Sequence, residues 1–195
     1  PNRLFVHAKL VAPFTAEFTQ RVAKMKAGNG MEEGVAIGPL VNDAALDKVE
    51  RHVQDALAQG ASLLLGGHRL MENGLHKGHF YAPTVLGGVT SAMQIYREET
   101  FGPVAPIIVF DDGDDVVAMA NDTHYGLASY VYTNDLARAM RVMEGLRFGI
   151  VGVNDINPTA AAAPFGGIKE SGLGREGGRD GIAEYLDTKL GGFSI

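Results

Sequence analysis

Apolar side chains recur at helical spacing in two segments near the start of the chain. In the first segment they fall at i, i+4, i+8 and i+11, which predicts a helix that Pro13 opens near Thr15 and that Gly28-Asn29-Gly30 ends. A second helix is expected to follow Asn42 or Asp43 and to stop at Gly60. The two predicted apolar faces consist of Phe14, Phe18, Val22 and Met25, and of Leu46, Val49, Val53 and Leu57.

Short apolar runs bounded by glycine, proline or asparagine predict strands. They cover residues 4–11, 62–65, 83–89, 105–110, 127–133 and 148–153, and the run 62–65 is expected to be a buried strand. Shorter helices are expected over residues 114–121, 135–145 and 179–185. Because strands alternate with helices along the chain, we predict an α/β fold with a largely parallel sheet flanked by helices.

The end of the chain differs from the rest. Residues 154–174 form a long loop rich in glycine and alanine, and loops of this length in compact domains are commonly functional. A terminal strand from Leu190 to Ile195 follows and is expected to leave the body of the domain. We therefore predict one domain over residues 1–187 and a separate strand segment over residues 188–195.

Composition and charge exclude several classes of partner. The 195 residues include 17 Lys and Arg against 23 Asp and Glu, giving a net charge of −6 without a basic run, which argues against nucleic acid and an anionic membrane. No apolar stretch approaches the roughly 18 residues that span a bilayer. The sequence has no cysteine, which excludes disulfides and zinc–thiolate sites. Pro1-Asn2-Arg3 does not resemble a signal peptide, and we expect a cytoplasmic protein.

An acidic pair precedes an apolar strand in the segment Glu98-Glu99-Thr100-Phe101-Gly102-Pro103. A carboxylate can accept hydrogen bonds from both hydroxyls of a ribose, and a neighbouring ring can pack on a flat heterocycle. In an extended segment Glu99 and Phe101 lie on one side and Glu98 on the other. Spacing alone favours a solvated turn, which is the commoner role of such a pair.

A glycine-rich block begins at Pro164 and continues to Gly177. Its glycines would let the backbone approach a ligand closely beside Phe165, but the spacing fits neither the Walker loop nor the dinucleotide fingerprint. Lys169 and Arg175 are therefore expected to form structural ion pairs. The six histidines are scattered, the spacing His76-x-x-His79 lies in a turn, and surface loops are the default expectation for them, so no metal site is predicted.

Four motifs in order resemble the C-terminal half of an NAD(P)-dependent aldehyde dehydrogenase, and the resemblance covers essentially the whole chain. The details between residues 153 and 186 are similar to succinate-semialdehyde and glutarate-semialdehyde dehydrogenases. The motifs are Glu98-Glu99-Thr100-Phe101-Gly102-Pro103, Asn121-Asp122-Thr123-x-Tyr125-Gly126-Leu127-Ala128, Gly152-Val153-Asn154 and the block from Pro164 to Glu176.

The resemblance implies oxidation of a small aldehyde, such as a semialdehyde, to the acid with NAD or NADP. In the family a cysteine thiolate forms a thiohemiacetal that transfers hydride to the nicotinamide, and a glutamate activates the water that releases the acid. The segment that follows this cysteine matches Pro1-Asn2-Arg3. The resemblance therefore places the cysteine, the general-base glutamate and the dinucleotide-binding domain upstream of Pro1, so no catalytic residue is expected here and the isolated chain is expected to be inactive.

The resemblance also assigns supporting roles to four residues. Glu99 matches the carboxylate that holds the nicotinamide ribose, and Phe101 matches the aromatic beside the nicotinamide. Thr159 and Phe165 would line the aldehyde pocket. The segment from Leu190 to Ile195 matches a strand that joins a neighbouring subunit, which implies a homodimer or homotetramer.

Two features depart from the semialdehyde dehydrogenase pattern. Residues 160–163 are four alanines where a polar loop is usual, and the arginines that would hold a substrate carboxylate are not identifiable. Two other functions stay open at this point. The chain could be a self-associating assembly module, or a cofactor-binding pseudoenzyme without catalysis.

Overall fold

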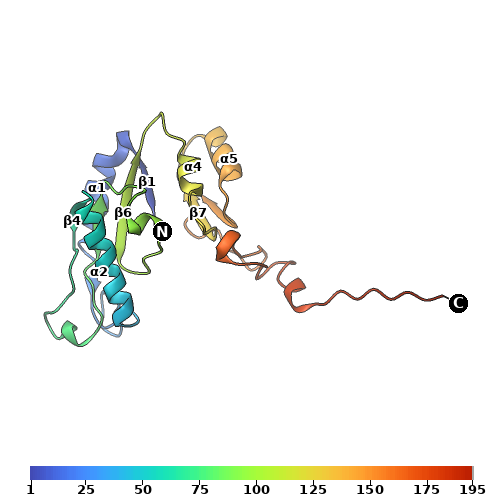
Figure 1. Ribbon diagram of the computed structural model, residues 1–195, viewed down its shortest axis with the longest axis horizontal. Coiled ribbons are helices and arrows are strands. Elements are labelled where there is room, and N and C mark those ends of the chain that lie inside the picture. Colours follow the sequence, from blue (N-terminus) through green and yellow to red (C-terminus); the bar gives the residue numbers. More distant parts are fainter. Residues whose placement is uncertain (195) are drawn as a thin grey trace. The chain divides into compact units, whose positions relative to one another are not determined.

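The computed structural model describes residues 1–194, which form two compact units. Unit 1 comprises Pro1–Asp114, and unit 2 begins at Asp115. In Figure 1 unit 1 runs from blue to green, and unit 2 from yellow to red. The predicted boundary between residues 187 and 188 concerns a different division of the chain and stays a prediction.

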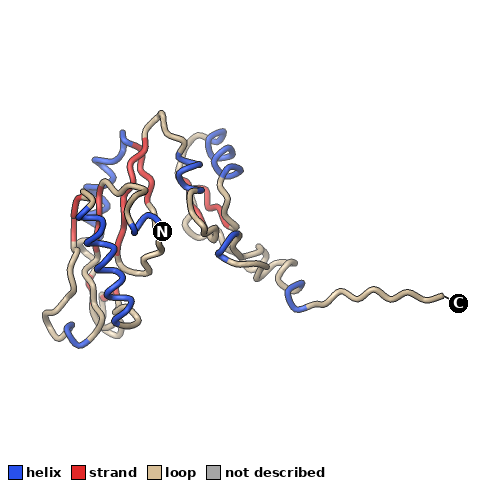
Figure 2. Tube along the Cα trace, viewed as in Figure 1, coloured by secondary structure: helices blue, strands red, loops and turns tan. Residues whose placement is uncertain are grey.

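Unit 1 contains a four-stranded sheet with the order β1-β6-β5-β4. β1, β6 and β5 are parallel, whereas β4 pairs antiparallel with β5. Figure 2 shows the strands in red. The prediction of an α/β fold with a largely parallel sheet is confirmed. The strands are β1 (Leu4–His7), β4 (Ser62–Leu65), β5 (Thr84–Gly87) and β6 (Val104–Phe110), and a separate parallel pair consists of β2 (Lys26–Ala27) and β3 (Val35–Ile37).

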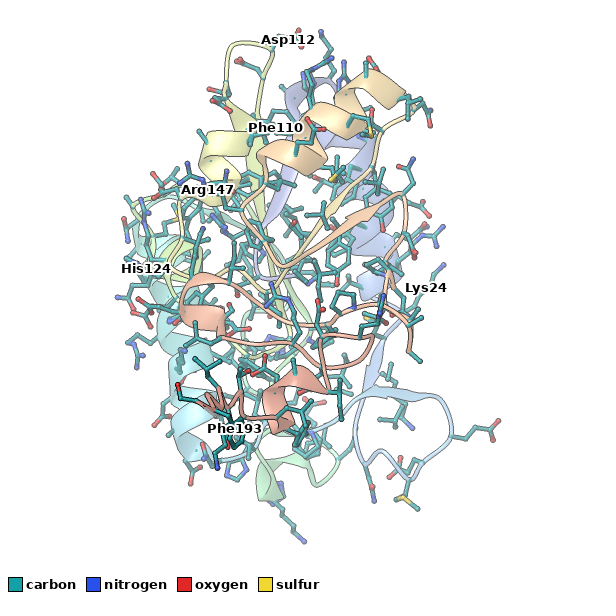
Figure 3. The ribbon with its side chains drawn as sticks, turned by 90° about the vertical axis from the view of Figure 1, so that its right-hand side faces the viewer. Lys24, Phe110, Asp112, His124, Arg147 and Phe193 are labelled. Carbon is teal, nitrogen blue, oxygen red and sulfur yellow. The ribbon has the colours of Figure 1, made fainter. Side chains whose placement is uncertain are left out.

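The strand predicted over residues 4–11 ends at His7, and α1 (Ala8–Val22) begins directly after it. His7 caps the helix by accepting a hydrogen bond from the Lys9 amide. Asp112 holds the same junction, because it bonds His7 Nε2 at 3.0 Å and Lys9 Nζ at 2.5 Å. Figure 3 labels Asp112 close to Phe110, whose ring meets that of His7 edge to face. The prediction that the strand continues to residue 11 was therefore wrong.

Pro13 lies inside α1 and does not open it, contrary to the prediction. A proline inside a helix costs about 3 kcal/mol because it removes a backbone hydrogen bond. Helix formation through Pro13 instead places apolar side chains against the sheet. The residues Val11, Phe18 and Val22 pack on the buried cluster of Val6, Val85 and Ile107.

The helix α2 (Asp43–Ala58) forms where the sequence predicts it. Asn42 is its N-cap and accepts a hydrogen bond from the Ala45 amide, while Gly60 has a φ of +97° just beyond the last turn. The buried face differs in one respect from the prediction, because Leu57 is only half-buried. The buried residues are Leu46, Val49, His52, Val53 and Ala56.

The strand β4 was predicted to be buried, and this was wrong. It is the last strand in the order of its sheet, and Leu63 and Leu64 are 44% and 38% exposed. A strand with a partner on one side only has fewer neighbours to cover its side chains. The buried positions lie instead on β5 and β6, where Val85, Leu86 and Ile107 are at most 1% exposed.

Unit 2 contains a two-stranded parallel sheet and two helices. The strands are β7 (Ala128–Val131) and β8 (Ile150–Val153), and the helices are α4 (Val116–Asn121) and α5 (Leu136–Gly145). Asp115 and Asp135 cap the two helices by accepting hydrogen bonds from Ala118 and Arg138. The helix predicted over 179–185 is reduced to one 3₁₀ turn, Ala183–Tyr185, after Gly177 and Gly178 adopt positive φ.

Residues 190–194 contain no strand within this chain, and Ile195 lies outside the described residues. The segment extends away from the rest of unit 2 (Figure 1), and Leu190 and Phe193 are 97% and 94% exposed. A strand that pairs with another subunit would have no partner in a single chain. The predicted role of this segment in oligomerisation therefore stays a prediction.

Candidate functional site

The acidic segment lies in unit 1 between the short helix α3 (Gln94–Arg97) and β6. Thr100 is only 3% exposed, whereas Phe101 is 80% exposed and Glu99 also faces solvent. Phe101 has a φ of +49°, which is uncommon for a bulky residue. The prediction that Glu99 and Phe101 lie on one side and Glu98 on the other assumed an extended segment. The left-handed conformation at Phe101 departs from that geometry. It leaves the Glu99 carboxylate and the Phe101 ring exposed beside a buried anchor.

The helix α2 holds the acidic segment from one side through two residues that are one turn apart. His52 Nε2 lies 3.1 Å from Glu98 Oε2, and His52 Nδ1 lies 3.1 Å from Thr100 Oγ1. Lys48 Nζ donates a hydrogen bond to the Glu99 carbonyl at 2.5 Å. The two side chains of α2 therefore contact three consecutive residues of the segment.

The side chain of Asn2 holds the backbone of the same segment. Its Nδ2 donates to the Glu98 carbonyl at 3.2 Å, and its Oδ1 accepts from the Thr100 amide at 3.1 Å. Asn2 belongs to the segment that, by the resemblance, follows the nucleophile of the family. The residues on either side of Glu99 are thus tied to the start of the chain.

The contacts of His52 were not predicted from the sequence, because the histidines were expected in surface loops. Its side chain is fully buried, and burial lowers its pKa, although the hydrogen bond and charge of Glu98 oppose this shift. The available signal was its position three residues after Val49, on the apolar face of the predicted helix. Its polar partners are 46 and 48 residues away, where no local pattern could have indicated them.

Thr159 and Phe165 lie in unit 2 and share one small hollow of about 200 Å³. Thr159 Oγ1 donates to Asn157 Oδ1 at 2.7 Å, and Phe165 exchanges two backbone hydrogen bonds of 2.7 Å with Glu176. The structure thus brings these two predicted residues together, and it brings Glu99 next to Phe101 in unit 1. The hollow is lined by Gly149, Ile150, Val151, Pro158, Thr159, Ala163, Pro164 and Phe165.

The glycine-rich block packs through its backbone. A methyl group at Gly149 would clash with the Gly166 carbonyl oxygen, so the residue directly before β8 lies against the backbone of the block. Arg175 Nη1 donates to the carbonyls of Gly167 and Gly174 at 2.8 and 2.6 Å. Arg175 therefore has the structural role that the sequence suggested, but its guanidinium binds carbonyl oxygens here and not a carboxylate.

A second hollow of about 280 Å³ lies in unit 1 beside Asp43, Arg69 and His79. His79 Nε2 is 3.1 Å from Asp43, and Arg69 bonds Glu50 and Asp47. Within residues 1–194, no group of three or more His, Cys, Asp or Glu side chains could hold a metal ion. None of the helices in this part of the chain is long and apolar enough to cross a membrane.

Comparison with known proteins identifies the family. The aldehyde dehydrogenase family matches residues 1–190. The chain belongs to this family. A probable NADP(+) succinate-semialdehyde dehydrogenase of Sinorhizobium fredii is 48% identical over 188 residues, which cover 96% of this chain and 38% of that protein. The NADP(+) succinate-semialdehyde dehydrogenase of Escherichia coli is 47% identical over 188 residues, which cover 96% of this chain and 38% of that protein.

A solved structure supports the same assignment. The aldehyde dehydrogenase from Brucella melitensis biovar abortus matches with a TM-score of 0.90 at 47% identity, over 96% of this chain and 38% of that one. The chain therefore spans less than two fifths of the length of these relatives. The resemblance in the sequence to this family, and to its semialdehyde dehydrogenases, is confirmed.

Proposed function

We propose that this chain forms part of an NAD(P)-dependent aldehyde dehydrogenase that oxidises a semialdehyde such as succinate semialdehyde. The observation that carries the proposal is the family match over residues 1–190, together with the exposed Glu99 and Phe101 on a segment anchored by buried contacts. The semialdehyde names of the relatives support the substrate class. A cytoplasmic location is part of the proposal.

Glu99 and Phe101 fit one half of a dinucleotide. The exposed carboxylate of Glu99 can accept hydrogen bonds from both ribose hydroxyls, and the exposed ring of Phe101 offers a flat apolar face to the nicotinamide. NAD(P)⁺, when bound, accepts the hydride that the substrate carbon loses. The two residues orient the acceptor and perform no bond-breaking step themselves.

The hollow beside Thr159 and Phe165 fits the aldehyde side of the reaction. The Thr159 hydroxyl can hydrogen-bond a polar substrate group, and the Phe165 ring offers an apolar wall to the carbon chain of the substrate. The proposed reaction would need a cysteine thiolate that adds to the aldehyde carbon. Bound NAD(P)⁺ would supply the hydride acceptor, and water would then split the thioester to the acid and the thiol. The cysteine and the general-base glutamate belong to residues upstream of Pro1 in this proposal.

The first prediction concerns activity. The purified 195-residue chain should not reduce NAD(P)⁺ with succinate semialdehyde, because it has no cysteine. A chimera in which this chain replaces the matching 188 residues of the E. coli enzyme should form NAD(P)H, measured by absorbance. Turnover by the chain alone would contradict the proposed division of the site, and a folded chimera without turnover would contradict the function.

A binding measurement on the purified 195-residue chain distinguishes a cofactor-binding pseudoenzyme from the proposed enzyme. Calorimetric titration of the 195-residue chain with NAD⁺ should give no heat of binding, because Glu99 and Phe101 contact only one part of a dinucleotide. Saturable binding by the chain alone, combined with an inactive chimera, would favour a cofactor-binding pseudoenzyme.

The second prediction concerns assembly. We propose that the segment from Leu190 to Ile195 joins a neighbouring subunit in a homodimer or homotetramer, which the exposure of Leu190 and Phe193 favours. Deleting residues 190–195 from the active chimera should lower its mass by light scattering, whereas replacing the exposed Met31 by Gln should leave it unchanged. An unchanged mass after the deletion would contradict the strand-exchange role.

A further inference from the structure

We propose that His52 is a positioning residue, which from α2 fixes the segment 98–101 so that Glu99 and Phe101 face the cofactor. The proposal rests on the proposed function, because it assumes the cofactor roles of these two residues. His52 itself is fully buried and contacts neither cofactor nor substrate in this account. Its effect is transmitted through Glu98 and Thr100, the residues on either side of Glu99.

The hydrogen bonds of His52 define one tautomer. An ionised Glu98 carboxylate can only accept, so Nε2 carries the proton and donates to Oε2. Nδ1 must then accept the hydroxyl proton of Thr100. Both ring nitrogens are used by the same short segment, which fixes the spacing between residues 98 and 100.

Three more contacts complete the frame around Glu99. Lys48 donates to the Glu99 carbonyl, and Asn2 bonds the carbonyl of Glu98 and the amide of Thr100. All of these contacts hold the backbone, whereas the Glu99 carboxylate and the Phe101 ring point into solvent. Such an arrangement keeps a ligand-binding side chain in place without occupying its polar atoms.

An apolar residue would fill the site of His52 more simply if packing were its only role. Burying two ring nitrogens is unfavourable unless both are hydrogen-bonded, and here both bonds go to the acidic segment. A residue that only stabilises the core predicts a loss of stability when it is replaced. A positioning residue predicts, in addition, a selective loss of cofactor affinity.

The third prediction tests this difference in the chimera. His52→Phe keeps an aromatic ring but removes both hydrogen bonds, and we expect it to raise the KM for NAD(P)⁺ about tenfold, which corresponds to roughly 1.4 kcal/mol. The KM for the aldehyde should change less than about twofold. His52→Gln retains a donor for Glu98 and should restore much of the cofactor affinity. His76→Gln alters an exposed histidine of the same unit and is the control.

A spectroscopic measurement on the 195-residue chain tests the positioning independently of activity. Nitrogen NMR should find His52 with a protonated Nε2 and an unprotonated Nδ1, and Thr100→Val should shift the Nδ1 signal. His52→Gln should speed hydrogen exchange at the Thr100 amide, which Asn2 bonds. If the wild-type chimera is inactive while these signals appear, the proposed function fails and the anchoring contacts stand.

Two results would overturn the positioning role. One is a stability loss in His52→Phe with the KM for NAD(P)⁺ unchanged in the folded enzyme. The other is a His52 ring with the opposite tautomer and no response to Thr100→Val. Where His52→Phe fails to fold, Thr100→Val decides the question, because it removes the bond to Nδ1 and leaves His52 in place. A raised KM for NAD(P)⁺ would support the positioning role, and an unchanged KM would overturn it.

Discussion

Replacing Gly102 by alanine is expected to lower the free energy of unfolding by about 1–3 kcal/mol. A methyl group at this position would lie 2.4 Å from Cγ2 of Val49, which is far inside van der Waals contact. Val49 is fully buried on α2 and β-branched, so its side chain cannot rotate away easily. Because Gly102 directly follows Phe101, the clash would displace the acidic segment from α2. Urea unfolding followed by circular dichroism measures the effect.

A second substitution identifies the cause. Val49→Ala alone should cost about 2 kcal/mol through the cavity that it leaves. In the double variant the two changes should partly compensate, so that its loss is smaller than the sum of the single losses by about 0.5–3 kcal/mol. Gly38→Ala is the matched control, because Gly38 has no atom within 4 Å of the added methyl group. Fully additive losses would contradict the contact between Gly102 and Val49.

The helices with strong local signals were predictable from the sequence. Asn42 precedes a regular apolar repeat, and α2 begins at the next residue. Asp115 and Asp135 likewise precede α4 and α5 and cap them through their side chains. In each case the signal is local, because a capping residue and the apolar repeat lie within a few positions of each other in the sequence.

The errors arose where distant contacts decide local structure. Pro13 was predicted to open α1, but the packing of Phe18 and Val22 on the sheet favours a helix that continues through it. The strand β4 was predicted to be buried because it is a short run of leucines. It lies at the edge of the sheet, which its own residues do not reveal. Burial depends on the order of strands, which hydrophobicity alone does not contain.

The candidate site shows the same division. Glu99, Phe101, Thr159 and Phe165 were predicted as site residues through the resemblance to the family, because spacing alone favoured a solvated turn at the acidic pair. Neither His52 nor Asn2 could be connected to the acidic segment from the sequence. Their bonds to Thr100 span 48 and 98 residues, and only the fold brings them together.

The proposed role of Glu99 in cofactor binding is tested most directly in the chimera with E. coli residues. Glu99→Gln removes the charge and one of the two acceptor oxygens, and hydrogen bonds to a charged group contribute about 1.5–3 kcal/mol each. The KM for NAD(P)⁺ should therefore rise about tenfold or more, and the KM for the semialdehyde should stay nearly constant. Glu33→Gln, which changes another exposed acid of unit 1, should have no effect.

The decisive measurement is the KM of the Glu99→Gln chimera for NAD(P)⁺ beside that of the unaltered chimera. We expect a large and selective rise for Glu99→Gln, with the circular dichroism spectrum unchanged. Equal values for the two folded proteins would contradict the claim that the acidic segment of this chain holds the cofactor of an aldehyde dehydrogenase.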